Sequence, residues 1–553
     1  MVLPRLKEYK TNNGYFENKL VFNINCKDSL KASKIFVLFA PAVMFDIAQN
    51  ANVIFVESSE KKSGAYELCV EPSKITVIYG TYEGIRNAMS TLAQLWKEGK
   101  CPCCEIVDEP DNDFRSCMLD LARGYVEIPV LKEHIVRMAL LKYNHIHLHL
   151  MDSFSYVLES DVVPNVDNRK VYTKQEMRDF IGLCKLLCLE VIPEIEIPAH
   201  ANNQIRALPE LGCDIIDKKK AVEIIRKLED PKKKLYTDNK RSVSAWVVCA
   251  GNEKTYAIYE KIVEEICQTF DGKYLHIGGD ELEMAILGAH PHWTNCVRCQ
   301  KKMKEENIAD VRRLYYYVMK RMYAIVTKFG KKMIIWNDQL DVENPIDIPK
   351  DIIVEYWRGD VITNEKYILQ KLCDQGFEII NAHYPYTYVD IVRYMQEKDI
   401  KRWNTKVDFF DEPTVNGRIL GGEMCAWEVG NPLYSFYSFS LPVCMVVFAD
   451  RVWNHATTEY DEEYKKSVFS VVIGIETEYH PFDFFTEILP PRDPDRHTLE
   501  DIPLDKIDGD KLAFVLSSVQ SLNMESVYGK LAIEAYIDLL SLIQDTVTTR
   551  TVK

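Results

Sequence analysis

The pattern of apolar and polar positions changes near residue 110, which divides the chain into two regions. Before that point, short strand and helix patterns follow one another. Residues 66–70 and 74–79 alternate apolar and polar positions on either side of a Pro-Ser turn, which predicts a β-hairpin. Residues 84–96 carry apolar side chains at helical spacing. Residues 1–110 are therefore predicted to form a small α/β domain.

From Phe114 onward, short apolar runs typical of buried strands recur, and amphipathic helical patterns lie between most of them. Alternation of strands with helices predicts a parallel sheet, and eight such units predict a closed (β/α)8 TIM barrel, here over residues 111–460. The predicted strands are 115–120, 144–150, 190–195, 273–278, 332–336, 351–356, 376–381 and 417–425. The predicted helices between them are 130–142, 174–187, 252–270 and 311–329.

The last part of the chain, residues 461–553, has a different character. Residues 478–510 are rich in Pro and Asp, which predicts an irregular segment. Residues 511–542 have helical periodicity. This C-terminal helical segment either packs under the barrel or forms the interface of a homodimer, and the sequence leaves both open.

Charge and composition narrow the range of partners. The chain of 553 residues has a formal net charge of −15, which argues against nucleic acid or an anionic membrane as the partner. No apolar stretch is typical of a transmembrane helix, and the opening MVLPRLKEYK lacks the apolar core of a signal peptide. Several of the 16 cysteines lie within apolar strands or helices, where a thiol acts as a small hydrophobic group. This usage favours the cytoplasm, unless a signal peptide has been removed.

Polar and aromatic residues gather at the ends of the predicted strands. The loops that follow the strands of a TIM barrel build its active-site face, so these residues are predicted to lie together. Acids mixed with Trp and Tyr are typical of a sugar site, because aromatic rings cover the apolar side of a pyranose while carboxylates accept bonds from its hydroxyls. The strand-end residues are Asp120, Arg123, Asp152, Glu194, Glu196, His200, Asp280, Glu281, Trp336, Asp338, Trp357, Arg358, Tyr386, Tyr388, Asp390, Glu423, Trp427 and Glu428.

One stretch, KYLHIGGDELE at residues 273–283, combines these features. Residues 274–277 predict a short buried strand, two glycines then allow a tight bend, and Asp280 and Glu281 follow directly. The structural alternative is a helix N-terminus, where acids interact favourably with the helix dipole. The His-Ile-Gly-Gly context and the acids at the other strand ends favour a catalytic role.

Three alternating histidines, His145, His147 and His149, share one face of the second predicted barrel strand. Such a set could hold a divalent metal with acids from other strands, as in a metal-dependent amidohydrolase that uses His145 and His147. Because a barrel interior is a filled core, a layer of hydrogen-bonded core histidines is the favoured interpretation.

Two cysteine motifs could bind metal or act in redox chemistry. His290, His292, Cys296 and Cys299 form an H-x-H-x3-C-x2-C cluster that could hold structural zinc. Its two halves are closer together than in usual zinc sites, so a loop with reduced thiols is favoured. CPCC at residues 101–104 has no second pair nearby and predicts a surface linker. The sequence thus predicts no metal and no cofactor.

An ordered set of motifs carries a family resemblance. It resembles the β-N-acetylhexosaminidases of glycoside hydrolase family twenty, and residues 1–110 resemble the small α/β domain that precedes the barrel in that family. The motifs are LDLARGY at 119–125, NHIHLHLMD at 144–152, VIPEIEIPAH at 191–200, HIGGDE at 276–281, Trp336, Trp357, TYVD at 387–390, GGEMCAW at 421–427 and ADRVW at 449–453.

The resemblance implies an exo-acting enzyme that releases terminal GlcNAc or GalNAc from glycans with retention, using the sugar's own 2-acetamido group as the nucleophile. It implies that Glu281 is the acid and base and that Asp280 holds the acetamido N–H. The other residues it implies are Arg123 for the ring hydroxyls, Tyr388 for the acetamido oxygen, Trp336, Trp357 and Trp427 for a methyl pocket, Asp152 and His200 for a polar relay, and Asp390 and Glu428 as further substrate contacts.

Three positions depart from the family pattern. Ser153 stands where a second acid is often found, Ala199 stands where glycine is usual before the histidine, and Glu428 follows Trp427 directly. These differences bear on the contacts to the 4- and 6-hydroxyls more than on the catalytic pair. Two other functions stay open, namely the metal-dependent amidohydrolase and a glycan-binding barrel without catalysis.

Overall fold

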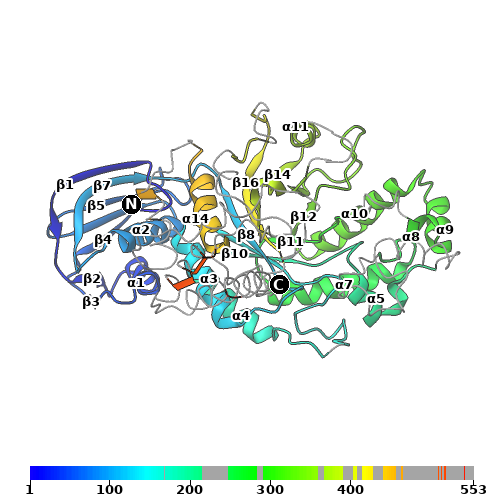
Figure 1. Ribbon diagram of the computed structural model, residues 1–553, viewed down its shortest axis with the longest axis horizontal. Coiled ribbons are helices and arrows are strands. Elements are labelled where there is room, and N and C mark those ends of the chain that lie inside the picture. The colour runs from blue at the N-terminus through cyan, green and yellow to red at the C-terminus, as the bar shows by residue number, and fades with distance from the viewer. Residues whose placement is uncertain are drawn as a thin grey trace.

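The computed structural model describes most of the first 455 residues, in which an N-terminal domain stands beside a barrel (Figure 1). None of the helices in this described part combines the length and hydropathy needed to span a bilayer. The described ranges are 1–166, 168–214, 247–282, 291–358, 367–389, 403–407, 414–427 and 440–455, with a few isolated positions between 463 and 541.

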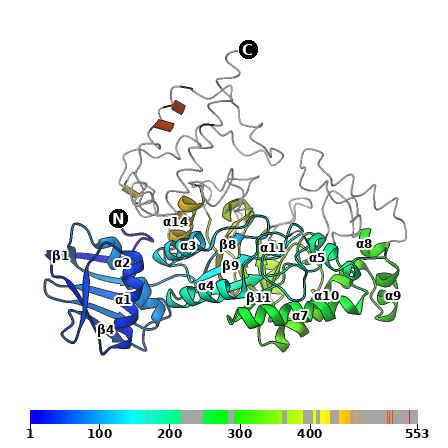
Figure 2. The same cartoon turned by 90° about the horizontal axis from the view of Figure 1, so that it is seen from below.

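The N-terminal domain is built on a five-stranded sheet with the order β1-β7-β5-β6-β4. Strands β5 (Tyr66–Val70) and β6 (Ile75–Tyr79) form the predicted antiparallel hairpin, in which every second side chain is buried. Helices α1 (Lys27–Phe39) and α2 (Tyr82–Leu95) lie between this sheet and the barrel (Figure 1 and Figure 2). The other strands are β1 (Glu8–Phe16), β4 (Val53–Glu57) and β7 (Cys101–Asp108), with β2 (Leu20–Asn23) paired to β3 (Phe45–Ala48) in a separate sheet.

The prediction of a surface linker at CPCC was wrong, because these residues begin strand β7 in the interior of the sheet. Cys101, Cys103 and Cys104 are all buried. Pro102 cannot donate to a ladder, but it precedes the part of β7 that pairs with β5 and lies opposite an irregularity in β1. The strand therefore accommodates a proline that, in the sequence, is typical of a connector.

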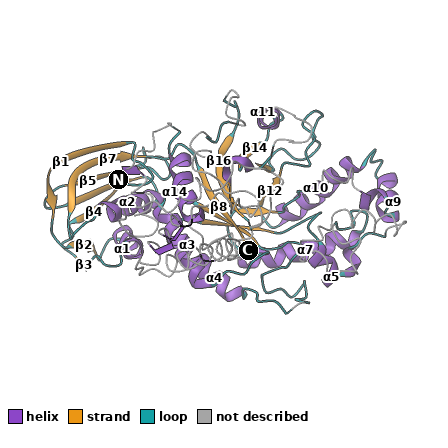
Figure 3. Ribbon diagram, viewed as in Figure 1, coloured by secondary structure: helices purple, strands orange, loops and turns teal. Residues whose placement is uncertain are grey.

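Eight parallel strands close into a barrel in the order β8-β9-β10-β11-β12-β13-β14-β16, and β16 pairs back to β8. The TIM-barrel prediction is therefore confirmed, and Figure 3 shows these strands at the centre of the molecule. A two-residue strand, β15 (Tyr388–Val389), also pairs with β16. The barrel strands are β8 (Phe114–Asp120), β9 (His145–His149), β10 (Glu190–Glu194), β11 (Tyr274–His276), β12 (Lys332–Trp336), β13 (Ile353–Tyr356), β14 (Glu378–Asn381) and β16 (Ile419–Ala426).

Long amphipathic helices follow the first four barrel strands and bury one face each. Helix α4 begins at a capping box in which Thr173 and Glu176 each bond the other's backbone N–H. These helices are α3 (Ile128–Leu140), α4 (Lys174–Leu186), α7 (Glu253–Thr269) and α10 (Val311–Lys328). Shorter elements are α5 (Asn202–Ala207), the 3-10 helix η1 (Pro209–Leu211), α8 (Pro291–Thr294), α9 (Val297–Glu305), α11 (Ile368–Asp374) and α12 (Tyr384–Thr387), and α14 (Ser440–Trp453) follows the last strand.

The interior of the barrel contains a buried network of histidines and glutamates. The ring of His147 lies between two carboxylates, with Nδ1 2.7 Å from Glu423 Oε1 and Nε2 3.2 Å from Glu194 Oε2. Nδ1 of His149 is 2.5 Å from the same Glu194 oxygen, and the indole N–H of Trp336 donates to Glu194 Oε1 at 2.7 Å. These histidines are hydrogen-bonded core residues, as the favoured interpretation predicted.

The carboxylates determine the charge of this network. Burial alone would lower the pKa of His147, but Glu423 and Glu194 raise it to about 9. Burial opposes the charged form of His149 as well, and Glu194 and Asp152 raise its pKa to about 10. Both rings are therefore cations at neutral pH, each held against an acid.

A second buried ion pair joins the N-terminal domain to the barrel. Lys142, which follows α3, is fully buried, and its ammonium lies 2.7 Å from Asp108 at the end of β7. The same ammonium is 3.0 Å from the hydroxyl of Tyr66, and the indole of Trp453 donates to the other Asp108 oxygen at 3.0 Å. Nearby, the buried guanidinium of Arg86 donates to the carbonyl of Ala139 at 2.9 Å. The interface between the two domains is thus stabilised by a buried ion pair and hydrogen bonds as well as by apolar packing.

The predicted C-terminal segment lies almost wholly outside the described residues. The irregular stretch 478–510, the helix at 511–542 and its role in a homodimer therefore stay predictions, as does the boundary at residue 460.

Candidate active site

The HIGGDE stretch forms a tight bend at the carboxyl end of β11. Gly278 and Gly279 have φ values of +66° and +98°, which side-chain-bearing residues rarely adopt. A Cβ atom added at Gly278 would lie 1.9 Å from Glu196 Oε2. This position therefore needs glycine for its backbone angles and for the close approach of Glu196.

The residues that carry the chemistry are themselves held in an unusual backbone conformation. Glu281 has φ +48° and His200 has φ +51°, both in the left-handed region that non-glycine residues seldom occupy. Such residues persist where the surrounding structure holds them, and they cluster at functional sites. Here the backbone N–H of Glu281 donates to Asp338 Oδ2 at 2.9 Å.

His200 connects the two adjacent acids to a third. Its Nδ1 is 3.1 Å from Asp152 Oδ2, and its Nε2 is 3.4 Å from Asp280 Oδ2 and 3.3 Å from Glu281 Oε2. Asp152 in turn binds the guanidinium of Arg123 at 2.8 Å. Asp152, His200 and Glu281 thus lie in one continuous chain of contacts, and their role as a relay stays a prediction.

This chain of charges sets the protonation of the site. Burial would lower the pKa of His200, but Asp280, Asp152 and Glu281 together raise it well above its usual value. Burial would raise the pKa of Glu281, yet the contact with His200 lowers it. The proton is therefore held on His200, within 3.3 Å of the Glu281 carboxylate.

One further acid, Glu196, lies beside Asp280. Burial and the neighbouring Asp280 raise the pKa of Glu196 well above its usual value. Asp280 is 8% exposed, and its Oδ1 accepts no hydrogen bond from the described residues. A buried carboxylate oxygen without a donor is costly, and it marks a place where a substrate N–H or O–H would bind.

An aromatic cluster borders these acids. Trp357 stacks on Tyr388 with ring centroids 6.0 Å apart, and Tyr388 lies 5.9 Å from Trp427. Trp336 is 6.0 Å from Trp427 and forms the inner end of the cluster, because its indole N–H is bound to Glu194. The structure therefore brings all four predicted aromatic residues together. It adds Tyr384, whose ring is 5.6 Å from Tyr388.

Arg123, which was predicted to bind sugar hydroxyls, is paired with two carboxylates of the protein. Its guanidinium binds Asp120 at 2.9 Å and Asp152 at 2.8 Å, and it lies 5.1 Å from the ring centroid of Trp427. The side chain is 14% exposed. Arg123 is therefore largely buried, and it holds Asp152 in place.

Three of the predicted strand-end residues are not seen in the aromatic and acidic cluster. Asp390 and Glu428 lie outside the described residues, and Tyr386 packs on His383 with ring centroids 5.2 Å apart. Asp338 was among the strand-end residues but was given no role. It accepts from the Glu281 backbone and from the indole of Trp357 at 3.2 Å, so that it positions both.

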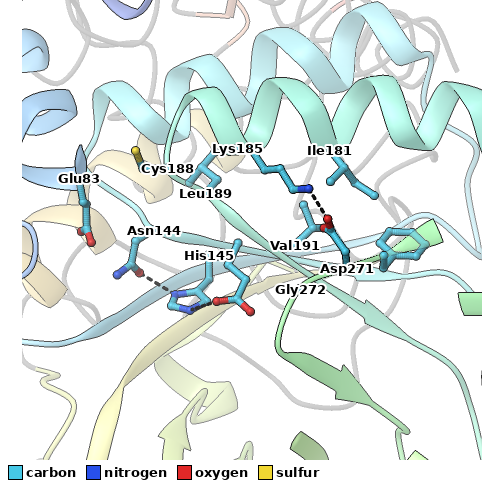
Figure 4. Close-up of a pocket in the computed structure, with 12 residues that line it drawn as sticks. Glu83, Asn144, His145, Ile181, Lys185, Cys188, Leu189, Val191, Asp271 and Gly272 are labelled. Atoms are coloured by element: carbon cyan, nitrogen blue, oxygen red, sulfur yellow. Dashed lines mark hydrogen bonds and ion pairs between the residues drawn. The ribbon is translucent and has the colours of Figure 1, made fainter. Parts of the chain in front are cut away.

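The amidohydrolase alternative needs His145 and His147 in one metal site, and the structure separates them. His145 stacks on Phe114 with ring centroids 4.1 Å apart, and its Nδ1 is 2.7 Å from Asn144. It lines a cavity of about 340 Å3 at the amino-terminal ends of the strands, opposite the end that carries Asp280 (Figure 4). Among the described residues, no group of three candidate metal ligands forms around His145. The proposed pairing was therefore wrong.

Comparison with known families matches this two-part architecture. The model for glycosyl hydrolase family 20, domain 2, matches residues 2–109. The model for the family 20 catalytic domain matches residues 113–455, which is more than half of the chain. The chain belongs to glycosyl hydrolase family 20. The resemblance noted in the sequence is thereby confirmed.

Curated relatives of this family 20 chain are β-hexosaminidases. That of Porphyromonas gingivalis is 27% identical over 323 residues, which are 54% of this chain and 38% of the relative. The β-hexosaminidase of Vibrio furnissii is 26% identical over 417 residues, which are 68% of this chain and 63% of the relative. The β-hexosaminidase subunit beta of Mus musculus is 24% identical over 370 residues, which are 65% of this chain and 62% of the relative. The chain therefore spans less than two thirds of the length of these relatives.

Solved structures of family 20 proteins share the fold. The exo β-N-acetylglucosaminidase of Vibrio harveyi, in complex with N-acetylglucosamine, has a TM-score of 0.70 at 21% identity and covers 85% of this chain and 77% of its own. The N-acetyl-β-hexosaminidase of Streptomyces plicatus has a TM-score of 0.66 at 18% identity, and the match covers 86% of this chain and 94% of the Streptomyces chain. At these identities the likeness establishes the fold of the family 20 chain.

Proposed function

We propose that this protein is an exo-acting β-N-acetylhexosaminidase, which releases terminal GlcNAc or GalNAc from glycans with retention of configuration. The observation that carries the proposal is the contact of Asp280 and Glu281 with one imidazole nitrogen of His200, beside the aromatic cluster. Family membership and the β-hexosaminidase relatives support it.

The arrangement of the two acids favours a nucleophile from the substrate. A retaining enzyme with a protein nucleophile places its two carboxyl groups on opposite faces of the sugar, about 5–5.5 Å apart. Asp280 and Glu281 instead approach the same nitrogen of His200 and so lie on one side of the site. The carbonyl oxygen of the 2-acetamido group would then attack C1, and an oxazolinium intermediate would form.

Each residue has a defined part in this mechanism. Glu281 protonates the leaving oxygen and, as the carboxylate, then takes a proton from the water that opens the intermediate. Its proton is drawn from His200, because a bound sugar excludes water and thereby favours the neutral acid. The Oδ1 of Asp280, which has no donor among the described residues, accepts from the acetamido N–H and stabilises the charge that develops there. Tyr388 donates to the acetamido oxygen, and Trp357 and Trp427 enclose the methyl group.

The substitution Glu281→Gln tests the central assignment. The amide keeps the shape but cannot donate a proton as an acid does, so we expect kcat to fall by about 10²–10⁴ on a disaccharide with an unactivated leaving group. Nitrophenyl glycosides need less protonation and should lose less. Glu260→Gln, on the outer side of α7 where Glu260 pairs with Lys328, is the matched control and should leave kcat unchanged.

Substrate analogues separate the mechanism from the activity. Aryl β-glucosides lack the acetamido group and should not be turned over, whereas a thiazoline made from GlcNAc mimics the cyclised intermediate and should inhibit tightly. Wild-type activity in Glu281→Gln on the disaccharide would contradict the assignment of Glu281. A wild-type protein that binds the sugar but hydrolyses none of these substrates would leave a glycan-binding barrel as the alternative. A sugar trapped on an Asp or Glu by a 2-fluoro glycoside, without thiazoline inhibition, would overturn substrate assistance alone.

A further inference from the structure

Four cysteines from two separate loops meet in a buried cluster, hereafter the four-cysteine cluster. Cys213 and Cys249 lie in the segment between β10 and α7, and Cys296 and Cys299 flank the start of α9, in the segment between β11 and α10. All four are buried, and their Sγ atoms all lie within 4.8 Å of one another. Sγ of Cys249 is 3.7 Å from Sγ of Cys296 and 3.7 Å from Sγ of Cys299.

These separations match the edges of a metal-centred tetrahedron. Zn–S bonds of about 2.3 Å give a regular ZnS4 tetrahedron with S···S edges of about 3.8 Å. A disulfide, by contrast, requires about 2.05 Å between its sulfurs, and all four cysteines are free. Four soft sulfur donors around one point are the ligand set that selects zinc or iron over the hard divalent cations.

We propose that the four-cysteine cluster of Cys213, Cys249, Cys296 and Cys299 binds one structural Zn²⁺ ion. Binding replaces four thiol protons by one metal ion, with four protons released to solvent and no change in oxidation state. All four positions are filled by protein sulfur, so no position stays open for water or substrate. The ion therefore has a structural role, distinct from the glycosidase chemistry at Asp280 and Glu281.

The backbone around the cluster is folded as a metal site requires. Cys296 and Cys299 form a C-x2-C pair in which Cys296 is the N-cap of α9 and Cys299 lies in its first turn. Gly251 approaches the same turn closely, since a Cβ there would lie 2.3 Å from the carbonyl oxygen of Arg298. A larger residue at Gly251 would push Cys249 away from the C-x2-C pair.

Charge and hydrogen bonding fit the same assignment. A ZnS4 centre carries a net charge of about −2, and Arg298 lies close enough to Cys213, Cys249 and Cys296 to interact with them electrostatically. The Arg298 guanidinium also binds Asp214 at 2.7 Å and the carbonyl of Gly212 at 2.5 Å, which joins the two loops beside the cluster.

The four-cysteine cluster connects the two segments that carry the active-site residues. The segment after β10 also carries His200, and the segment after β11 also carries Asp280 and Glu281. Helices α5, α8 and α9, which belong to these segments, lie at the end of the molecule far from the N-terminal domain (Figure 1 and Figure 2). Around the cluster they are joined by single contacts, such as the indole N–H of Trp293 to the carbonyl of Val248 at 2.9 Å. Zinc would join both loops through four strong bonds.

This site corrects the partners that the sequence suggested. The H-x-H-x3-C-x2-C spacing paired Cys296 and Cys299 with His290 and His292. His290 lies outside the described residues, and His292 is not among the side chains whose ligand atoms gather with the four sulfurs. Cys213 and Cys249 take the two remaining places.

Metal analysis of the purified wild-type protein tests the proposal directly. Protein expressed in zinc-supplemented medium and purified without chelator should contain about one zinc per chain by mass spectrometry of the elements. Titration with an organomercurial should release that zinc, followed with a chromogenic chelator, as about four thiols react. Replacement by Co²⁺ should give the intense charge-transfer absorption of a tetrathiolate site.

Variants locate the metal. Cys213→Ser and Cys299→Ser, one from each loop, should each reduce bound zinc at least tenfold and lower the unfolding temperature. Cys184→Ser is the matched control, because Cys184 is a fully buried thiol in α4 outside the cluster, and it should keep its zinc. If the cluster variants do not fold, the wild-type stoichiometry and the cobalt spectrum decide the question.

Four results would overturn the proposal. These are wild-type protein with less than about a tenth of an equivalent of zinc, iron in place of zinc, an intact mass that shows two disulfides, or full zinc retention in both Cys213→Ser and Cys299→Ser. None of them depends on glycosidase activity, so the proposed function stands or falls separately.

Discussion

The charged network inside the barrel makes stability depend on pH in a way that one substitution should remove. Glu423→Gln keeps the shape of the side chain beside His147 and removes its charge. In the wild type, Glu423 and Glu194 raise the pKa of His147 from 6.5 to about 9 against the effect of burial. The variant should return that pKa toward its ordinary value, because one of the two carboxylates is gone.

The size of the effect follows from linkage. A difference between a folded pKa of about 9 and an unfolded pKa of 6.5 corresponds to about 3 kcal/mol. Because the folded value is the higher one, this stabilisation is fully present below about pH 6.5 and is lost as the pH rises through about 9. Between pH 7 and pH 10 the wild type should lose about 2–3 kcal/mol from His147 alone.

Urea unfolding followed by tryptophan fluorescence measures this loss. The free energy of unfolding of wild type and Glu423→Gln should be compared at pH 7 and pH 10, where thiols and tyrosines titrate equally in both proteins. We expect the two proteins to differ by about 2–3 kcal/mol at pH 7 and to converge by pH 10.

Glu190→Gln provides the matched control. Glu190 starts the neighbouring strand beside His145, whose pKa burial lowers to about 3, so this imidazole stays neutral over the whole range. This control should follow the pH dependence of the wild type. If Glu423→Gln does so too, His147 is not a buried cation and the reasoning fails.

Two further active-site substitutions, one of them with a control in α4, test the geometry of the site. Gly278→Ala forces a Cβ against Glu196 at a positive φ, so kcat should fall at least tenfold and the unfolding midpoint should fall with it. Gly182→Ala in α4, where the added methyl meets nothing, should leave kcat unchanged and raise stability by up to about 1 kcal/mol. Tyr388→Phe removes the proposed donor to the acetamido oxygen, so kcat on N-acetylglucosaminides should fall by about 10². Unchanged kcat in Tyr388→Phe would refute that contact.

The barrel could be predicted from the sequence because each strand is a local apolar run followed by a polar strand end. Every predicted barrel strand overlaps an observed one, and the acids at the ends of β9 and β11 meet at His200, which follows β10. The proline in CPCC led to the wrong prediction of a linker. A proline is tolerated in a strand where no partner strand needs its N–H, and Pro102 lies outside the part of β7 that pairs with β5. That pairing is set by the tertiary structure.

Other features depend on partners that are distant in sequence. Cys213 and Cys249 complete a site with a C-x2-C pair that lies 47 residues beyond Cys249, and no local spacing indicates this. The role of Asp338 likewise depends on its contact with Glu281, 57 residues away. Such partners are set by the order of strands around the barrel, which brings consecutive loops side by side.

The buried pair of Lys142 and Asp108 limits how far the two domains of this protein can be treated as interchangeable modules. A barrel separated from residues 1–110 would keep Lys142 but lose the carboxylate and the Tyr66 hydroxyl that make its burial tolerable. The indole of Trp453 would lose its acceptor at the same time. In recombination between family members, the amino-terminal domain and the surface of α3 and α14 that it covers must therefore be inherited together.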